Sequence, residues 1–112
     1  MHDIKESDWK AFKPLRGRAL DRFYGRLLDE VARTGSDQTK SRHERYVAID
    51  QMTRERDKEI DQIFDTLRRS TAIIQICSLR LHGLLTDDEV RQFSPEIVDQ
   101  VKHFVRYHDE ST

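Results

Sequence analysis

Glycine, proline and cysteine are all scarce in this chain. Its 112 residues include four Gly, two Pro and one Cys, and it lacks short runs in which apolar and polar residues alternate between turn residues. Because strands joined by tight turns need such runs, we expect no β-sheet. The single Cys excludes an intrachain disulfide and is typical of a reducing compartment. The sequence therefore predicts an all-α protein, which we expect to be cytoplasmic.

Long apolar runs and a strong charge of one sign are also missing. No apolar run approaches the ~18 residues that a membrane-spanning helix needs, and no signal peptide is visible. The formal net charge of −1 predicts no general attraction to nucleic acid or to an anionic membrane. No stretch matches a phosphate-binding loop, a dinucleotide fingerprint, a zinc-binding spacing or a nucleophile elbow. We therefore expect neither an enzyme nor a bound cofactor or metal.

The apolar residues that are present align along one helical stripe. At about 100° per residue, the spacing predicts a single long helix from near Ser41 to Leu81. Its last part, residues 72–81, carries a second apolar face and should be buried from two sides. The very polar segment Thr53 to Glu59 is the alternative place for a break. Because the stripe stays in phase across that segment, we favour a continuous helix.

A first helix precedes the long one. Ser7 is a plausible N-cap, and Gly35 should end the helix after Thr34. Pro14 either begins the main helix after a short turn or kinks one longer helix, and we favour the turn. The apolar face of this helix consists of Trp9, Phe12, Ala19, Leu20, Phe23, Leu27 and Val31.

Two shorter helices should complete the fold. Gly83 ends the long helix, and Thr86 with Glu89 forms a capping box that begins a short one. Ser94 and Pro95 begin the last helix, whose apolar face should cover the second face of the long one.

The chain as a whole is therefore expected to be an elongated helical hairpin or bundle with one long central helix. We expect a single domain over residues 1–112, with residues 1–6 and 109–112 frayed.

The long helix also suggests what the protein does. Some 40 residues at 1.5 Å each form a rod of roughly 60 Å, which exceeds the ~13 Å radius of gyration of a compact domain of this length. The apolar stripe of this helix, which we call the seam, is longer than one short chain can cover. We therefore expect a homodimer. The function predicted is a non-enzymatic interaction module, an adaptor or small regulator, that self-associates through Ile63, Leu67, Ile74 and Leu81.

Charged residues interrupt the predicted seam. Folding the first helix back on the second places Arg16 opposite Arg56 and Asp57, which predicts a polar layer that fixes the register. The alternative is that this level is simply open to water. Asp57, Asp61 and Asp65 form a row at i, i+4 spacing, which we interpret as a surface neutralised by nearby Arg and Lys side chains.

A ridge of Arg18, Arg22 and Arg26 lies opposite the apolar stripe of the first helix. Such a ridge could contact nucleic-acid phosphates, and this is the alternative function. Pairing with the acidic C-terminal helix, within one chain or between subunits, would also explain it.

Other candidate chemistry is weaker. Asp99 and His103 share a helix face but have no second pair to complete a metal site. His43 and Glu44 point about 100° apart and are better explained as solvated surface. Cys77 lies on the apolar stripe, so we expect a buried, unreactive thiol.

Overall fold

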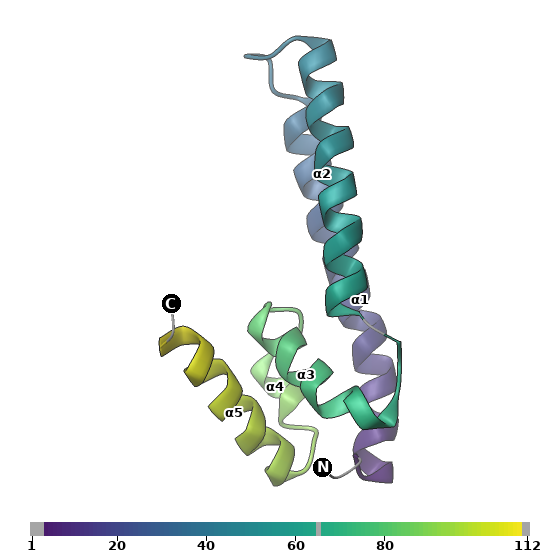
Figure 1. Ribbon diagram of the computed structural model, residues 1–112, viewed down its shortest axis with the longest axis vertical. Helices are drawn as coiled ribbons and strands as arrows, with labels where there is room; N and C mark the ends of the chain where they lie inside the picture. Colours follow the sequence, from purple (N-terminus) through teal and green to yellow (C-terminus); the bar gives the residue numbers. More distant parts are fainter. Residues whose placement is uncertain (1–3, 65, 111–112) are drawn as a thin grey trace.

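The computed structural model describes residues 4–64 and 66–110 (Figure 1). Within these ranges the chain is helical and contains no strand, which confirms the all-α prediction. The elements are α1 (Glu6–Gly35), α2 (Arg42–Ile63), the 3₁₀ turn η1 (Arg69–Thr71), α3 (Ala72–Leu81), α4 (Asp87–Val90) and α5 (Pro95–Glu110). The expected frayed start overlaps with ordered structure, because Ile4 is buried and Glu6 begins α1. At the other end, α5 continues to Glu110.

The molecule has a projecting stalk and a compact body. Figure 1 shows α2 running back along the upper part of α1, while α3, α4 and α5 gather on one side of its lower part. We call residues 24–62 the stalk and the remainder of the described chain the body. The principal extents are 52 × 29 × 23 Å, so the expected elongated hairpin is observed. Its longest helix is α1 rather than the central one, since α1 belongs to both parts.

The first helix passes through Pro14 without a preceding turn, so the prediction of a separate turn was wrong. Pro14 lies inside α1, which begins at Glu6 with Lys5 as its N-cap. A proline in a helix removes one backbone hydrogen bond. Phe12 and Leu15, on either side of it, are buried in the core, and this burial offsets the lost hydrogen bond.

The predicted continuous helix to Leu81 was also wrong, although the chain does not break where it is most polar. The segment from Thr53 to Glu59 is helical, as we favoured, and α2 ends instead at Ile63. Its start is fixed by a capping box between Ser41 and Glu44.

Tertiary contacts explain where α2 ends. The buried Phe64 ring packs edge-on against Phe23 with the ring centroids 6.2 Å apart. Arg16 Nη2 donates to the Phe64 carbonyl at 3.4 Å. In a longer helix this carbonyl would accept a backbone N–H from the next turn, but here Arg16 of α1 supplies the hydrogen bond instead. No Gly or Pro lies between residues 36 and 82, and local sequence therefore gives no stop signal here.

The core lies in the body, around α3. Its fully buried large side chains are Phe12, Ile76, Leu79, Leu84 and Leu85. Helix α3 packs mainly on α5 and also contacts α1, which confirms that residues 72–81 are covered from two sides. Gly83 adopts a φ of +70° after α3, a conformation that glycine adopts without steric cost.

The helix starts predicted after Gly83 are confirmed. The capping box of Thr86 and Glu89 is present at the start of α4, and α5 begins at Pro95.

Candidate protein-binding groove and the arginine face

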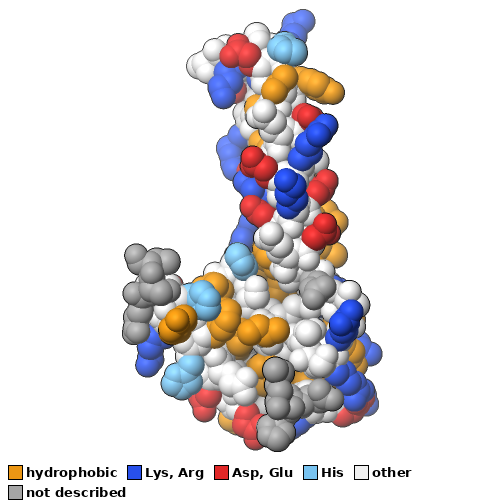
Figure 2. Space-filling model, viewed as in Figure 1, with side chains coloured by type: hydrophobic (Ala, Val, Ile, Leu, Met, Phe, Trp, Pro, Cys, Tyr) orange, Lys and Arg blue, Asp and Glu red, His pale blue; other side chains and the backbone are white. Residues whose placement is uncertain are grey.

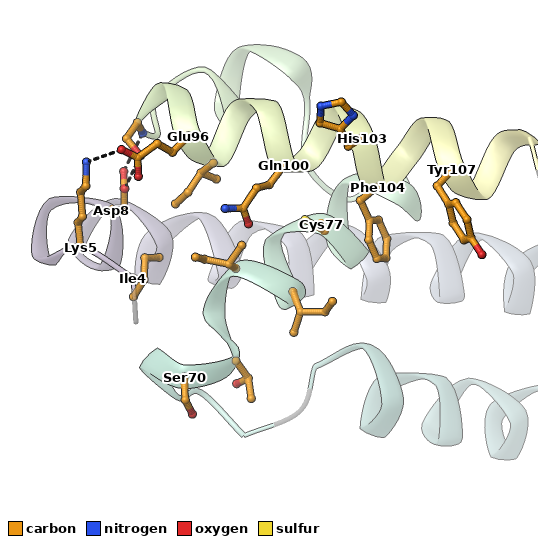
Figure 3. Close-up of a pocket in the computed structure, with 15 residues that line it drawn as sticks. Ile4, Lys5, Asp8, Ser70, Cys77, Glu96, Gln100, His103, Phe104 and Tyr107 are labelled. Atoms are coloured by element: carbon orange, nitrogen blue, oxygen red, sulfur yellow. Dashed lines mark hydrogen bonds and ion pairs between the residues drawn. The ribbon is translucent and has the colours of Figure 1, made fainter. Parts of the chain in front are cut away.

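An apolar groove opens between α3 and α5 beside the N-terminal end of α1 (Figure 3). Its volume is about 1010 Å³. Cys77 and Ile97 are buried in it, whereas Ile74 is 58% exposed. The groove is lined by Ile4, Lys5, Asp8, Ser70, Thr71, Ile73, Ile74, Cys77, Ser94, Glu96, Ile97, Gln100, His103, Phe104 and Tyr107. Figure 2 shows hydrophobic side chains gathered on this face of the body.

The two ends of the groove differ in chemistry. At one end Asp8, a buried carboxylate, accepts hydrogen bonds from the backbone N–H and the hydroxyl of Ser94, both at 2.8 Å. These bonds tie the start of α5 to α1. On the rim beside them, Lys5 Nζ lies 3.3 Å from Glu96 Oε1. Figure 3 shows Phe104 and Tyr107 at the opposite end, with their rings on the groove side of α5. The groove therefore runs from a charged end to an aromatic end.

Cys77 is buried, as predicted, and its chemistry follows from that position. Burial raises the pKa of its thiol to about 11, so the reactive thiolate is scarce at neutral pH. We expect Ellman's reagent to react with the folded chain at least about 100-fold more slowly than with the chain unfolded in guanidinium. The rate is followed by absorbance. A folded-state rate close to the unfolded one would show that the floor of the groove is open to reagents.

The predicted arginine ridge faces the body. Arg22 Nη1 and Nη2 donate to the two carboxylate oxygens of Glu89 at 2.6 and 2.9 Å. Arg22 Nη1 also donates to the Leu84 carbonyl, and Arg18 Nη1 lies 3.7 Å from Glu89 Oε2. Arg26 donates to the carbonyls that follow α3. This agrees with the intramolecular alternative, except that the acidic partner belongs to α4 rather than to the last helix.

Glu89 is the electrostatic centre of this contact. It is buried, and it also accepts the backbone N–H of Thr86 at 2.9 Å. The hydrogen bonds from Arg22 lower the pKa of Glu89 to about 2 despite the opposing effect of burial. The carboxylate is therefore charged at every ordinary pH, and it holds α4 against α1.

The predicted polar register layer is not formed by its three members together. Arg56 bonds Glu30 of α1 at 3.0 Å and Glu59 at 2.8 Å. Arg16 lies lower on α1, where its Nε donates to Gln75 at 2.9 Å. Asp57 is exposed on α2. The layer was misplaced because the offset between the two helices was not predicted. Ile49, and not the first turn of α2, lies beside Gly35 at the end of α1, so Arg56 is level with Glu30 rather than with Arg16.

The four residues predicted for self-association occupy different environments. Ile63 is buried in the core, and Leu81 is half-buried. Leu67 is 38% exposed in the segment that links α2 to η1. Ile74 lines the groove. The end of α2 at Ile63 separates these residues, so they do not form one stripe on one helix.

The remaining candidate chemistry is dispersed. Asp99 and His103 are exposed on α5, and Glu44 caps α2 beside the exposed His43. Asp61 is exposed like Asp57, while Asp65 lies outside the described residues. Residues 4–64 and 66–110 contain no cluster of three or more His, Cys, Asp or Glu side chains placed to hold a metal ion. In the same ranges, no helix is both long enough and apolar enough to cross a bilayer.

Sequence reasoning missed the groove itself. The neighbours Ile73 and Ile74 signalled that α3 carries apolar residues on more than one side, and the aromatic residues of α5 supplied the facing wall. Comparisons with protein-family models, with curated proteins and with solved structures gave no match.

Proposed function

We propose that the chain is a non-enzymatic interaction module that binds an amphipathic helix of a partner protein in the groove between α3 and α5. The observation that carries the proposal is Ile74, which is 58% exposed on the wall of a large and mainly apolar groove. Isolated exposed apolar residues are ordinary, but a contiguous apolar concavity of this size is typical of a binding site.

The dimensions of the groove suit a helix. Its lining residues on α5 extend from Glu96 to Tyr107, which at 1.5 Å per residue is about 17 Å, or three helical turns. Anchors at i, i+3 or i+4 and i+7 on a bound helix span about 10 Å, so two turns can seat their apolar face. The Lys5 and Glu96 side chains at one end can then pair with polar residues of the partner and set its direction.

Nucleic-acid binding through Arg18, Arg22 and Arg26 is not favoured by any contact on this face. Arg22 and Arg26 already donate to Glu89 and to backbone carbonyls. A phosphate would have to displace these bonds, two of which hold a buried carboxylate. We therefore place the function in the groove rather than on the arginine face.

The proposal is tested with Ile74→Glu. A displayed library of short amphipathic helices is selected against the wild-type chain, and binders are measured by fluorescence anisotropy against both proteins. Placing a charge among apolar anchors should weaken binding by at least about 30-fold. Circular dichroism should show the same helical content in both proteins, because Ile74 is exposed.

The matched control is Leu28→Glu, which changes another aliphatic residue that is more than half exposed, on the stalk. Selected helices should bind this variant as they bind the wild type. Failure to select any binder, or binders that distinguish neither variant, would overturn the assignment of the groove. Binders sensitive only to Leu28→Glu would move the interaction site to the stalk.

A further inference from the structure

The stalk contains no buried side chain. Between Tyr24 and Gln62, every described residue is at least partly exposed, including seam residues such as Leu27, Ile49 and Ile60. Two helices that pack only on each other gain little from burial, and isolated helices are marginal in water. The stalk therefore offers apolar surface that the chain itself does not cover.

This uncovered surface follows one side of α1. Leu20, Tyr24, Leu28 and Val31 recur at three- and four-residue spacing, and we call them the outer stripe. Leu20 and Val31 are partly exposed, and Leu20 also packs against the core. Tyr24 is 45% exposed and Leu28 67% exposed. Arg22 and Arg26, which bond the body, lie about 200° around the helix from Tyr24 and Leu28. Tyr24 and Leu28 thus lie on the side of α1 away from the arginines that bond the body.

Acidic side chains of α2 lie beside the outer stripe on the stalk, and the body carries basic side chains on the same side. We consider the positions at which α1 and α2 face each other. Because the two helices are antiparallel, the residue that follows such a position lies on the same side of the hairpin in both helices. Asp50 follows Ile49 and Asp57 follows Arg56, so both carboxylates lie on the side of the outer stripe. Figure 2 shows acidic and basic side chains interspersed along the right-hand edge of the stalk and mainly basic ones along the same edge of the body. Asp50 pairs with Arg54 of its own helix, so Asp57 is the acidic side chain available to a partner.

We propose that a second copy of this chain docks on the outer stripe, with the two α1 helices antiparallel and crossing near Tyr24. Antiparallel docking brings the stalk of each copy alongside the body of the other. Leu20 of one copy then lies opposite Leu28 of the other. This surface is separate from the groove, so the two proposals stand or fall independently.

The antiparallel register also matches the charges. Arg56 is level with Glu30 and Phe64 with Phe23, so Asp57 is level with a point about five residues above Tyr24. The two copies are related by a two-fold axis that passes near Tyr24. Asp57 of the second copy therefore lies beside the first copy at a level about five residues below Tyr24. This level lies between Phe64, which packs on Phe23, and Arg69, which pairs with Glu6 about five turns below Tyr24 on the same side of α1. Leu67 and Arg68, both exposed, belong to the segment between these two contacts. Asp57 of each copy therefore meets Arg68 of the other, and Leu67 contributes apolar surface to the same contact.

The proposal is tested by analytical ultracentrifugation of the full chain. We expect a species of twice 13.3 kDa. Leu28→Glu should raise the dimer dissociation constant by about 100-fold, because the symmetry introduces two charges into the apolar contact. Ile74→Glu, in the groove, should leave it unchanged. A wild-type chain that remains monomeric at 100 micromolar, or a dimer that Ile74→Glu dissociates and Leu28→Glu does not, would overturn the proposal.

A charge exchange tests the register without touching the apolar stripe. Asp57→Lys and Arg68→Glu should each weaken the dimer by about fivefold, and the double variant should recover wild-type affinity. Both side chains are exposed, so each variant should keep its helical circular dichroism. Dimerisation that depends on Leu28 but ignores both charge variants would overturn the antiparallel register.

Discussion

Replacing Phe12 by Ala should lower the free energy of unfolding by about 4 kcal/mol. The Phe12 side chain has no exposed surface and is among the largest fully buried side chains. It lies on the lower part of α1, against the core built from α3 and the segment that follows it. Removing the ring leaves a cavity between elements that are distant in sequence. Guanidinium unfolding followed by circular dichroism at 222 nm measures the change.

The free energy of unfolding lost in Phe12→Ala should be a large share of the wild-type value, because domains of this kind have unfolding free energies of roughly 5–15 kcal/mol. Tyr46→Ala is the matched control, since it removes an aromatic ring that is 70% exposed on the stalk. It should change the free energy of unfolding by no more than about 0.5 kcal/mol. Equal effects of the two substitutions would mean that the body does not form the stable core.

Replacing Glu89 by Gln should lower the free energy of unfolding by about 2 kcal/mol at pH 7. The substitution removes the charge that Arg22 pairs with through two short hydrogen bonds. Breaking a buried ion pair costs about 3–5 kcal/mol, and we expect less because the Arg22 side chain is partly open to water. Asp88→Asn, on the exposed side of the same short helix, should change the free energy of unfolding by less than about 0.5 kcal/mol.

The effect of Glu89→Gln should depend on pH. In the folded chain the pKa of Glu89 is lowered to about 2 from an ordinary value of 4.5. The unfolded chain therefore takes up the proton first as the pH falls, and the stability contributed by the charged carboxylate is complete above pH 4.5. That contribution is lost between about pH 4.5 and pH 2. Wild type and variant should converge in stability over this range, and a constant difference would show that the charge is not responsible.

Local signals in the sequence were enough to place most helix ends. The capping box of Thr86 and Glu89 begins α4 and Pro95 begins α5, as predicted, and α1 ends at Gly35, one residue later than predicted. Ser7 is not the N-cap of α1, because Lys5 occupies that position. The end of α2 could not be predicted in this way. It depends on the packing of the buried Phe64 ring against Phe23 and on the hydrogen bond from Arg16 to the Phe64 carbonyl, which joins residues 48 positions apart.

The candidate site was only partly accessible from the sequence for the same reason. Periodicity identified Ile74 as an apolar residue available for association, and the structure places it on the groove. The groove exists because α5 returns to pack along α3 while the N-terminal end of α1 closes one side. That arrangement depends on contacts such as Asp8 with Ser94, which join residues 86 positions apart.

The absence of any buried side chain in the stalk divides the described chain into parts of unequal local stability. Amide hydrogens of the stalk can exchange with solvent through partial openings that break α1 against α2 while the body stays closed. Exchange in the body requires disruption of the core around Phe12 and Leu79. Because α1 runs unbroken through both parts, protection from exchange should fall along this one helix from its buried lower turns toward Gly35.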